Sequence, residues 1–146
     1  MSASNAFETS LLGLIVTNVD AANVGDAAGL QNSAAAGVFW IGLHTADPGE
    51  AGDQTTNETA YTNYARQDEA RDTVQWTVTN DTADNDNAIG FPTGGASGAT
   101  LTHFALGSAS TAAGNLFLSG ALTASLAVSS GITPSFAAGA LDLVVG

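Results

Sequence analysis

The sequence predicts an all-β chain with one short helix near the N-terminus, folded as a β-sandwich or barrel. Charged residues make up only 11% of the 146 residues, whereas glycine occurs 17 times; ordinary soluble domains contain roughly 25% charged residues. Such a composition is typical of turn-rich β proteins. In addition, short apolar runs recur between glycine or serine clusters in the second half of the chain, as strands and turns do in sandwiches and barrels.

Helical spacing is confined to the beginning of the chain. Asn5 followed three residues later by Glu8 resembles a capping box. The apolar residues that then fall on one helical face are Phe7, Leu11, Leu14 and Ile15. Gly13 weakens the helical pattern, and Thr17–Gly37, rich in Ala, Gly, Asn and Asp, is expected to be a loop.

The remaining elements are predicted to be strands and turns. Val38–His44 is an apolar, branched and aromatic run typical of a buried strand, and Asp47-Pro48-Gly49 after it favours a type II turn. Thr79–Asn87 is predicted to be an exposed hairpin connection. The other predicted strands are Tyr61–Ala65, Val74–Val78, Ala88–Phe91, Ala99–Leu106, Asn115–Ser119, Ala121–Val128, Ile132–Phe136 and Ala140–Val145.

The length of the chain favours one folded domain. A chain of about 150 residues buries roughly 68–70% of its unfolded surface without disulfides, and this chain has no cysteine. There is no internal repeat and no long proline-rich linker, so we expect an N-terminal helical segment over residues 1–20 and a single β-sandwich domain over residues 21–146. We expect no membrane span and no secretory signal, because polar residues and glycine interrupt the apolar runs and no basic segment precedes them.

The charge of the chain is strongly acidic and unevenly distributed. Two arginines, Arg66 and Arg71, stand against 14 acids, which gives a net charge of −12. We therefore expect neither a nucleic acid nor an anionic membrane as a partner, since both attract clusters of basic residues. Residues 87–141 contain no Asp, Glu, Lys or Arg. This neutral stretch is the second distinctive feature of the chain.

No catalytic motif is present in the sequence. The chain has no lysine, which excludes a phosphate-loop lysine or a Schiff base, and it has no Gly-x-Ser-x-Gly motif. Two neighbouring carboxylates are weak evidence for a glycosidase in a chain with 14 acids, because a glycosidase also needs a long aromatic-lined cleft. We therefore expect no enzyme, no catalytic residues and no cofactor, and we keep a glycan-binding or glycan-cleaving module only as a remote alternative.

Candidate metal ligands are weak. His44 and His103 are the only histidines, and without cysteine they give thin support for a zinc site. His44 is expected to cap backbone groups at the end of its strand, and His103 to face solvent or a partner. The segment 81–87 is rich in Asp and Asn, but Ala88 and Ile89 stand where a calcium loop needs ligands, so a solvated turn is favoured over a calcium site. We expect no metal.

Segments along nearly the whole chain resemble small virion structural proteins of tailed bacteriophages. The segments that carry the resemblance are Phe7-Glu8-x-x-Leu11-Leu12-x-Leu14-Ile15, Gly25–Gln31, Leu43–Glu50, Thr56-Asn57-Glu58-x-x-Tyr61-Thr62-x-Tyr64-Ala65-Arg66, Thr102–Gly107, Ser119–Leu122 and Gly131–Phe136. Related sequences are often named tail-fibre proteins, and comparably small all-β chains serve as capsid cement or decoration proteins with jelly-roll or sandwich folds. The resemblance implies a single β-sandwich or jelly-roll-like domain and no catalytic residues.

Within this family resemblance the sequence favours a capsid cement protein. A fibre usually requires greater length, repeats and an anchoring segment, and these are absent. The expected role is to bridge major capsid subunits on the capsid exterior, after synthesis in the host cytoplasm, with the major capsid protein and other copies of the chain as partners. The alternative is a tail-associated structural protein, either a fibre or an adaptor.

The neutral stretch supplies the predicted interface. Charged residues are depleted at the cores of stable interfaces, so we expect Thr100–Leu106 and Asn115–Val128 to contact neighbouring subunits, unless these strands simply form the core. The acidic loops Asp47–Glu58 and Asp81–Asp86 are expected to face solvent. The candidate interface residues are Thr100, Thr102, His103, Leu116, Leu118 and Leu122.

Overall fold

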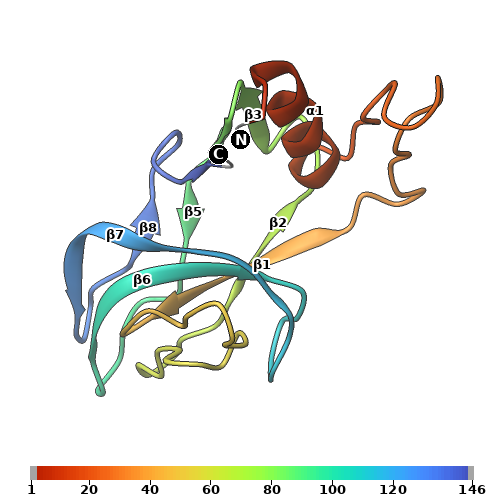
Figure 1. Cartoon of the computed structure of the whole chain (residues 1–146). Helices are drawn as coiled ribbons and strands as arrows, with labels where there is room; N and C mark the ends of the chain where they lie inside the picture. The colour runs from red at the N-terminus through yellow and green to blue at the C-terminus, as the bar shows by residue number, and fades with distance from the viewer. Residues whose placement is uncertain (1–2, 145–146) are drawn as a thin grey trace. The chain divides into compact units, whose positions relative to one another are not determined.

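The computed structural model describes residues 3–144 and confirms a mostly β chain with a short N-terminal helix (Figure 1). The strands form three sheets, with the orders β2-β1-β6-β7, β3-β4-β9 and β5-β8. The elements are α1 (Asn5–Val16), β1 (Val38–His44), β2 (Gln67–Ala70), β3 (Trp76–Thr79), β4 (Thr82–Asn85), β5 (Ile89–Gly90), β6 (Ala99–Gly107), β7 (Leu116–Val128), β8 (Ser135–Phe136) and β9 (Asp142–Val144). Over residues 3–144, no helix has the length and apolar character needed to cross a membrane.

The described residues group into two compact units. We call residues 3–38, 70–88 and 136–144 the α1 unit, and residues 39–69 and 89–135 the β6 unit. Each unit joins segments that are distant in the sequence. The division into an N-terminal segment, residues 1–20, and a single domain, residues 21–146, stays a prediction.

The N-cap of helix α1 lies one residue earlier than the sequence predicts. Ser4 is the N-cap, with extended backbone angles and a side-chain oxygen that accepts from the Phe7 N–H at 3.4 Å. Serine and asparagine are equally good N-caps, so the prediction of Asn5 as the cap was wrong by one position, and Glu8 falls outside the capping box. Leu12 and Val16 are fully buried, whereas Phe7, predicted on the inward face, is 46% exposed.

The C-terminal end of α1 is held by an arginine from elsewhere in the same unit. The helix has no basic residue in its last turn, and its last carbonyls have no partner within the helix. Arg71 donates to the carbonyls of Leu14 at 2.8 Å and Ile15 at 2.5 Å, and also to Ala36 at 3.0 Å. The positive guanidinium therefore both satisfies these acceptors and complements the helix dipole.

The sheet of the α1 unit corrects one sequence prediction. Thr79–Asn87, predicted to be an exposed connection, contains strand β4, which pairs antiparallel with β3 and β9. Ala83 and Asn85 are completely buried. Asn85 can lie inside because its amide donates to the carbonyls of Asn87 and Ala137 and accepts from the N–H groups of Ala140 and Leu141.

In the main sheet of the β6 unit, the bounds of β1 and β6 agree closely with those predicted from the sequence. β1 has the predicted bounds, β6 extends the predicted strand by one residue, and the two pair antiparallel with Ile41 opposite Leu106 and Leu43 opposite Phe104. These four side chains are all buried and form the centre of the apolar face. Burial of such side chains stabilises the fold by about 1.5–3 kcal/mol each.

β7 is one continuous strand where the sequence predicted two. The predicted break falls at Gly120, which lies opposite Phe104 within the ladder of β6 and β7. A Cβ atom at Gly120 would come within 2.9 Å of the Phe104 ring. The glycine therefore makes room for a ring across the strand rather than a turn.

The predicted strand Tyr61–Ala65 is also wrong. Asn63 has a left-handed backbone, with φ of 79°, which interrupts an extended run. The tyrosines on either side form an edge-on pair with ring centroids 5.4 Å apart, and the Tyr61 hydroxyl donates to the Pro92 carbonyl. The segment is thus a packed loop, and the following strand is β2.

Two neighbouring acids on β2, at one edge of the main sheet, should make the stability of the fold depend on pH. Burial, followed by repulsion from Asp68, raises the pKa of Glu69 to about 7. In the unfolded chain this carboxyl ionises near pH 4.3. Because its pKa is higher in the folded state, ionisation of Glu69 lowers the free energy of unfolding, and this loss grows as the pH rises from about 4.3 to 7. Glu69→Gln should therefore match the parent at pH 4 and be more stable at pH 8, by about 1 kcal/mol after allowance for solvent screening.

Thermal unfolding at pH 4, 6 and 8 measures this effect, with a gain in melting temperature of about 2–4 °C expected at pH 8. Asp68→Asn is the control, because it retains Glu69 and removes the weaker of the two causes. An equal gain for Glu69→Gln at all three pH values would contradict the prediction.

Candidate functional site

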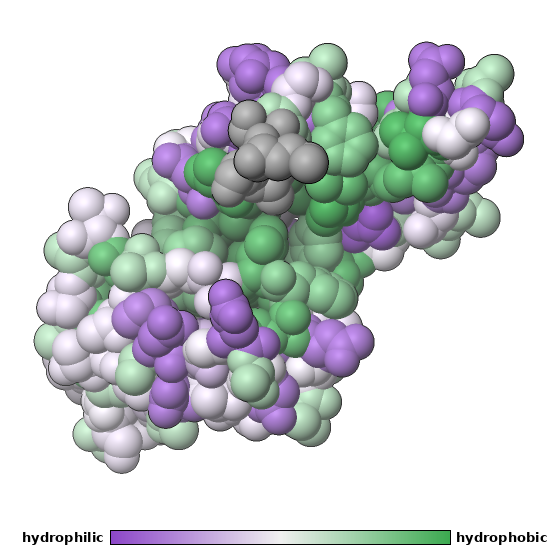
Figure 2. All heavy atoms as spheres, viewed as in Figure 1, coloured by the Kyte–Doolittle hydropathy of each residue, from purple (hydrophilic) through white to green (hydrophobic). Residues whose placement is uncertain are grey.

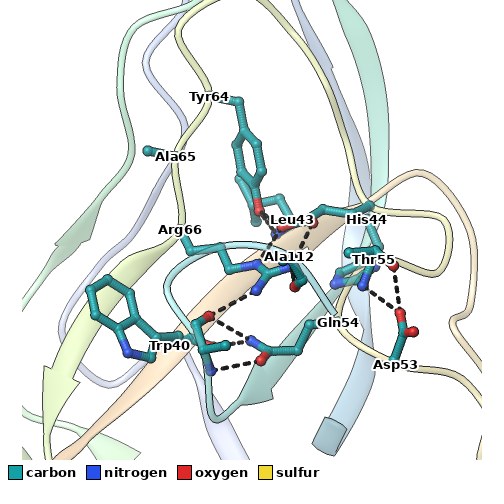
Figure 3. A network of polar contacts seen from close by, with 12 residues as sticks. Trp40, Leu43, His44, Asp53, Gln54, Thr55, Tyr64, Ala65, Arg66 and Ala112 are labelled. Carbon is teal, nitrogen blue, oxygen red and sulfur yellow. Dashed lines mark hydrogen bonds and ion pairs between the residues drawn. The ribbon is translucent and has the colours of Figure 1, made fainter. Parts of the chain in front are cut away.

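The most extensive polar cluster of the β6 unit is centred on Arg66 and Glu58 (Figure 3). The Arg66 side chain is 2% exposed and that of Glu58 15% exposed, with Nε to Oε1 at 2.6 Å and Nη2 to Oε2 at 2.7 Å. Such a two-pronged contact is the strongest arrangement of a guanidinium and a carboxylate. Tyr64 adds a third member, since its hydroxyl donates to Glu58 Oε1 at 2.8 Å and accepts from the Leu43 N–H.

The same arginine reaches the loop between β6 and β7. Its Nη1 donates to the carbonyl of Ala109 at 2.8 Å, and its Nη2 donates to the carbonyl of Ala112 at 3.0 Å. Ala112 has a left-handed backbone, with φ of 60°. One buried side chain thereby fixes a loop that is 43 residues away in the sequence.

Gln54 fixes that loop from a second direction. Its amide oxygen accepts from the Ala109 N–H at 2.8 Å, and its amide nitrogen donates to the carbonyls of Trp40 and Ala109. Gln54 lies so close to β6 that a Cβ atom at Gly107 would come within 2.1 Å of its side chain. A glycine is therefore required at this point of the strand.

His44 and His103 come together in a way that the sequence did not reveal. They are directly opposite each other on β1 and β6. His44 is 1% exposed, its Nδ1 lies 2.9 Å from the Thr56 carbonyl, and burial lowers its pKa. The predicted backbone cap is thus confirmed for His44, whereas His103 is half-buried with its Nδ1 2.9 Å from the Thr102 hydroxyl.

The electrostatics of the cluster keep its groups in fixed protonation states at neutral pH. Glu58 raises the pKa of Arg66, and burial raises that of Tyr64. The arginine therefore remains charged and the tyrosine remains a donor. Because these groups satisfy one another and nearby carbonyls, the cluster serves to hold loops in place.

The loop Asp47–Glu58, expected to face solvent, lies partly inside. Gln54 is buried, and Glu58 is in the cluster. Asp53 organises a tight turn, in which its Oδ1 accepts from the N–H and hydroxyl of Thr55; these hydrogen bonds lower the pKa of Asp53. Gly49 has the positive φ, 71°, that the predicted turn requires.

The acidic segment considered for calcium is part of the α1 unit. Asp84 lies opposite Asp142 across β4 and β9. Burial raises the pKa of Asp84, and the neighbouring carboxyls of Asp142 and Asp86 raise it further. Within residues 3–144, no group of three or more acidic, histidine or cysteine side chains is arranged to hold a metal ion.

The predicted interface residues all lie on β6 and β7. Thr100 is exposed, and Thr102, His103, Leu116, Leu118 and Leu122 are half-buried. Figure 2 shows one face of the molecule, where pale and light green residues predominate on the body that carries these strands. Their role in contacts stays a prediction.

The chain is a small, mostly β protein whose internal polar cluster holds loops in place. The chain belongs to the family described as Podophage GP4 fiber I protein gp80, which it matches over residues 3–144. No curated protein matches the chain. The family membership supports a bacteriophage structural protein located in the virion.

The family description also bears on the two roles weighed from the sequence. It names a fibre protein, which agrees with the tail-associated alternative and gives no support to the capsid cement expectation. The cement expectation rested on the short length of the chain, the absence of repeats and of an anchoring segment, and the neutral stretch at residues 87–141.

The buried ion pair gives a test of the loop-holding role. Arg66→Met should destabilise the β6 unit by about 3–5 kcal/mol, because it leaves the Glu58 carboxylate without its cation and two carbonyls without their donor. Chemical denaturation measures this loss. Tyr64→Phe removes the hydroxyl that donates to the Glu58 carboxylate and accepts from the Leu43 N–H, and it should cost about 2 kcal/mol.

The double variant Glu58→Gln with Arg66→Met completes the comparison. It should recover part of the loss, since no buried charge is then left without a partner. A loss below that of Tyr64→Phe for Arg66→Met alone would show that the pair does not hold the loops.

Proposed function

We propose that this chain is a structural subunit of a podophage tail fibre. The observation that carries the proposal is the match to a fibre protein family over residues 3–144, which includes both compact units. The chain would act through its shape and its contacts with other proteins rather than through catalysis. Its polar cluster supports that role, because a subunit that transmits force needs loops that are held in place by buried hydrogen bonds.

The surface chemistry supports attachment through the neutral strands. Both arginines bind carbonyls or a carboxylate within their own units, so they are engaged by the fold. The acids leave a chain of net charge −12, which repels nucleic acid and other acidic surfaces. The uncharged strands β6 and β7 can be buried against a neighbouring virion protein with little desolvation cost.

The location and number of copies in the virion test the proposal. We expect purified particles to contain a few tens of copies at most, as the symmetry of a tail allows, and gold-labelled antibody to bind at the tail. Quantitative mass spectrometry against the major capsid protein gives the number. Hundreds of copies spread over the shell would overturn the fibre assignment in favour of a cement protein that bridges capsid subunits.

Particles assembled without the chain provide the matched control. A fibre subunit should leave the heat resistance of the DNA-filled capsid unchanged and abolish or reduce adsorption to the host. A loss of capsid heat resistance with normal adsorption would contradict the proposal.

A further inference from the structure

Strand β7 ends the main sheet without a further partner among the described residues. In the order β2-β1-β6-β7 it pairs with β6 on one side and forms the edge on the other. It runs for 13 residues, from Leu116 to Val128, and contains no charged residue and no proline. Long uncharged edges with open backbone groups are templates for pairing with another strand.

The opposite edge of the same sheet is built differently. β2 has only four residues, and two of them are Asp68 and Glu69. Short strands and charges are the usual means by which an edge is protected from pairing. The β2 edge is therefore protected by its short length and its charges, and β7 has neither of these protections.

We propose that a second copy of this chain adds to the β7 edge, with the two β7 strands antiparallel about a two-fold axis at Ser119. This inference deepens the proposed function and rests on it, because it names a partner for the neutral strands of a fibre subunit. The resulting sheet would be continuous across two copies.

The sequence of β7 is self-complementary about Ser119. Antiparallel pairing centred there puts Ser119 opposite itself, Leu118 opposite Gly120 and Phe117 opposite Ala121. Each large side chain thus meets a small one. The next pair out is Leu116 opposite Leu122, and such like pairs stabilise a sheet.

The geometry of β7 is favourable at the same place. The ladder with β6 shifts register between Leu106 and Gly107 and again between Leu101 and His103, and Leu118–Ala121 is the regular stretch between these shifts. Ser119 and Ala121 are exposed, and Phe117 is 50% exposed while its ring lies edge-on to Phe39 at 5.9 Å. The proposed axis therefore passes through the part of β7 that pairs regularly with β6.

Charge selects a second copy as the occupant. Two chains of net charge −12 repel each other, so they can approach closely only where neither carries acids. β7 against β7 satisfies this condition, whereas β7 against β2 would place Asp68 and Glu69 beside the new strand. The two-fold arrangement is favoured over a head-to-tail one for that reason.

A cysteine placed on the axis tests the register directly, because the chain has no cysteine of its own. In the full-length chain, Ser119→Cys should form a disulfide-linked dimer in mild oxidant, since opposite antiparallel residues lie about 4.5–5.5 Å apart, within the range for a disulfide. Ala121→Cys is the matched control. It is exposed on the same strand, but the register separates the two cysteines by roughly 14 Å, so it should remain monomeric on a non-reducing gel.

Light scattering of the unlinked protein gives the oligomeric state. The parent chain should be a dimer that tightens as salt is raised, because salt screens the repulsion between acidic chains. Ser119→Lys places two like charges on the axis and should weaken the dimer roughly tenfold, whereas Ser130→Lys, an exposed change outside β7, should leave the dimer intact.

Three results would overturn the pairing: a monomer at all concentrations and salts, a trimer, or equal cross-linking by Ser119→Cys and Ala121→Cys. Failure of this inference is distinguishable from failure of the proposed function. A monomer in solution that is located at the tail overturns the pairing alone, and a dimer located on the capsid shell overturns the fibre assignment alone.

Discussion

The contact between Arg66 and Glu58 is the interaction on which the β6 unit depends. A guanidinium and a carboxylate are costly to remove from water, and the cost is offset only when nearly all their hydrogen bonds are made. Here Arg66 binds both carboxylate oxygens and two carbonyls of the loop after β6, while Tyr64 binds the same carboxylate. Segments far apart in the sequence are therefore held together by one charged side chain. Arg71 has the equivalent part in the α1 unit, where it binds the end of α1.

This use of the arginines explains the surface that the protein presents. With Lys+Arg 2 in the whole chain, assigning both arginines to internal bonds leaves the acids without cations to balance them. The net negative charge makes close contact with other acidic surfaces unfavourable. It also makes the position of neutral surface important, because two copies of the acidic chain can meet there without repulsion.

The sequence predicted the elements that depend on local pattern. β1 has the expected bounds and α1 and β6 differ by one residue, because capping chemistry and runs of apolar residues act within a few positions. The errors have long-range causes. Gly120 was interpreted as a turn, because its need for space comes from Phe104 on another strand. Asn85 was placed in a loop, because three of the four hydrogen-bond partners of its side chain lie more than 50 residues away. The cluster around Arg66 and the pairing of His44 with His103 depend on strand register, which no local signal in this sequence gives.

The two edges of the main sheet show how one sequence can favour assembly and limit it. An unprotected edge at both sides would allow chains to add without end, since each added copy would expose another open strand. The acids of β2 make one edge unfavourable for pairing, and the symmetric sequence around Ser119 makes the other edge complementary to itself. A two-fold contact of this kind is closed, because both open edges are used in a single interface. In the proposed pairing, closure of that kind would prevent growth into open aggregates while retaining a continuous sheet.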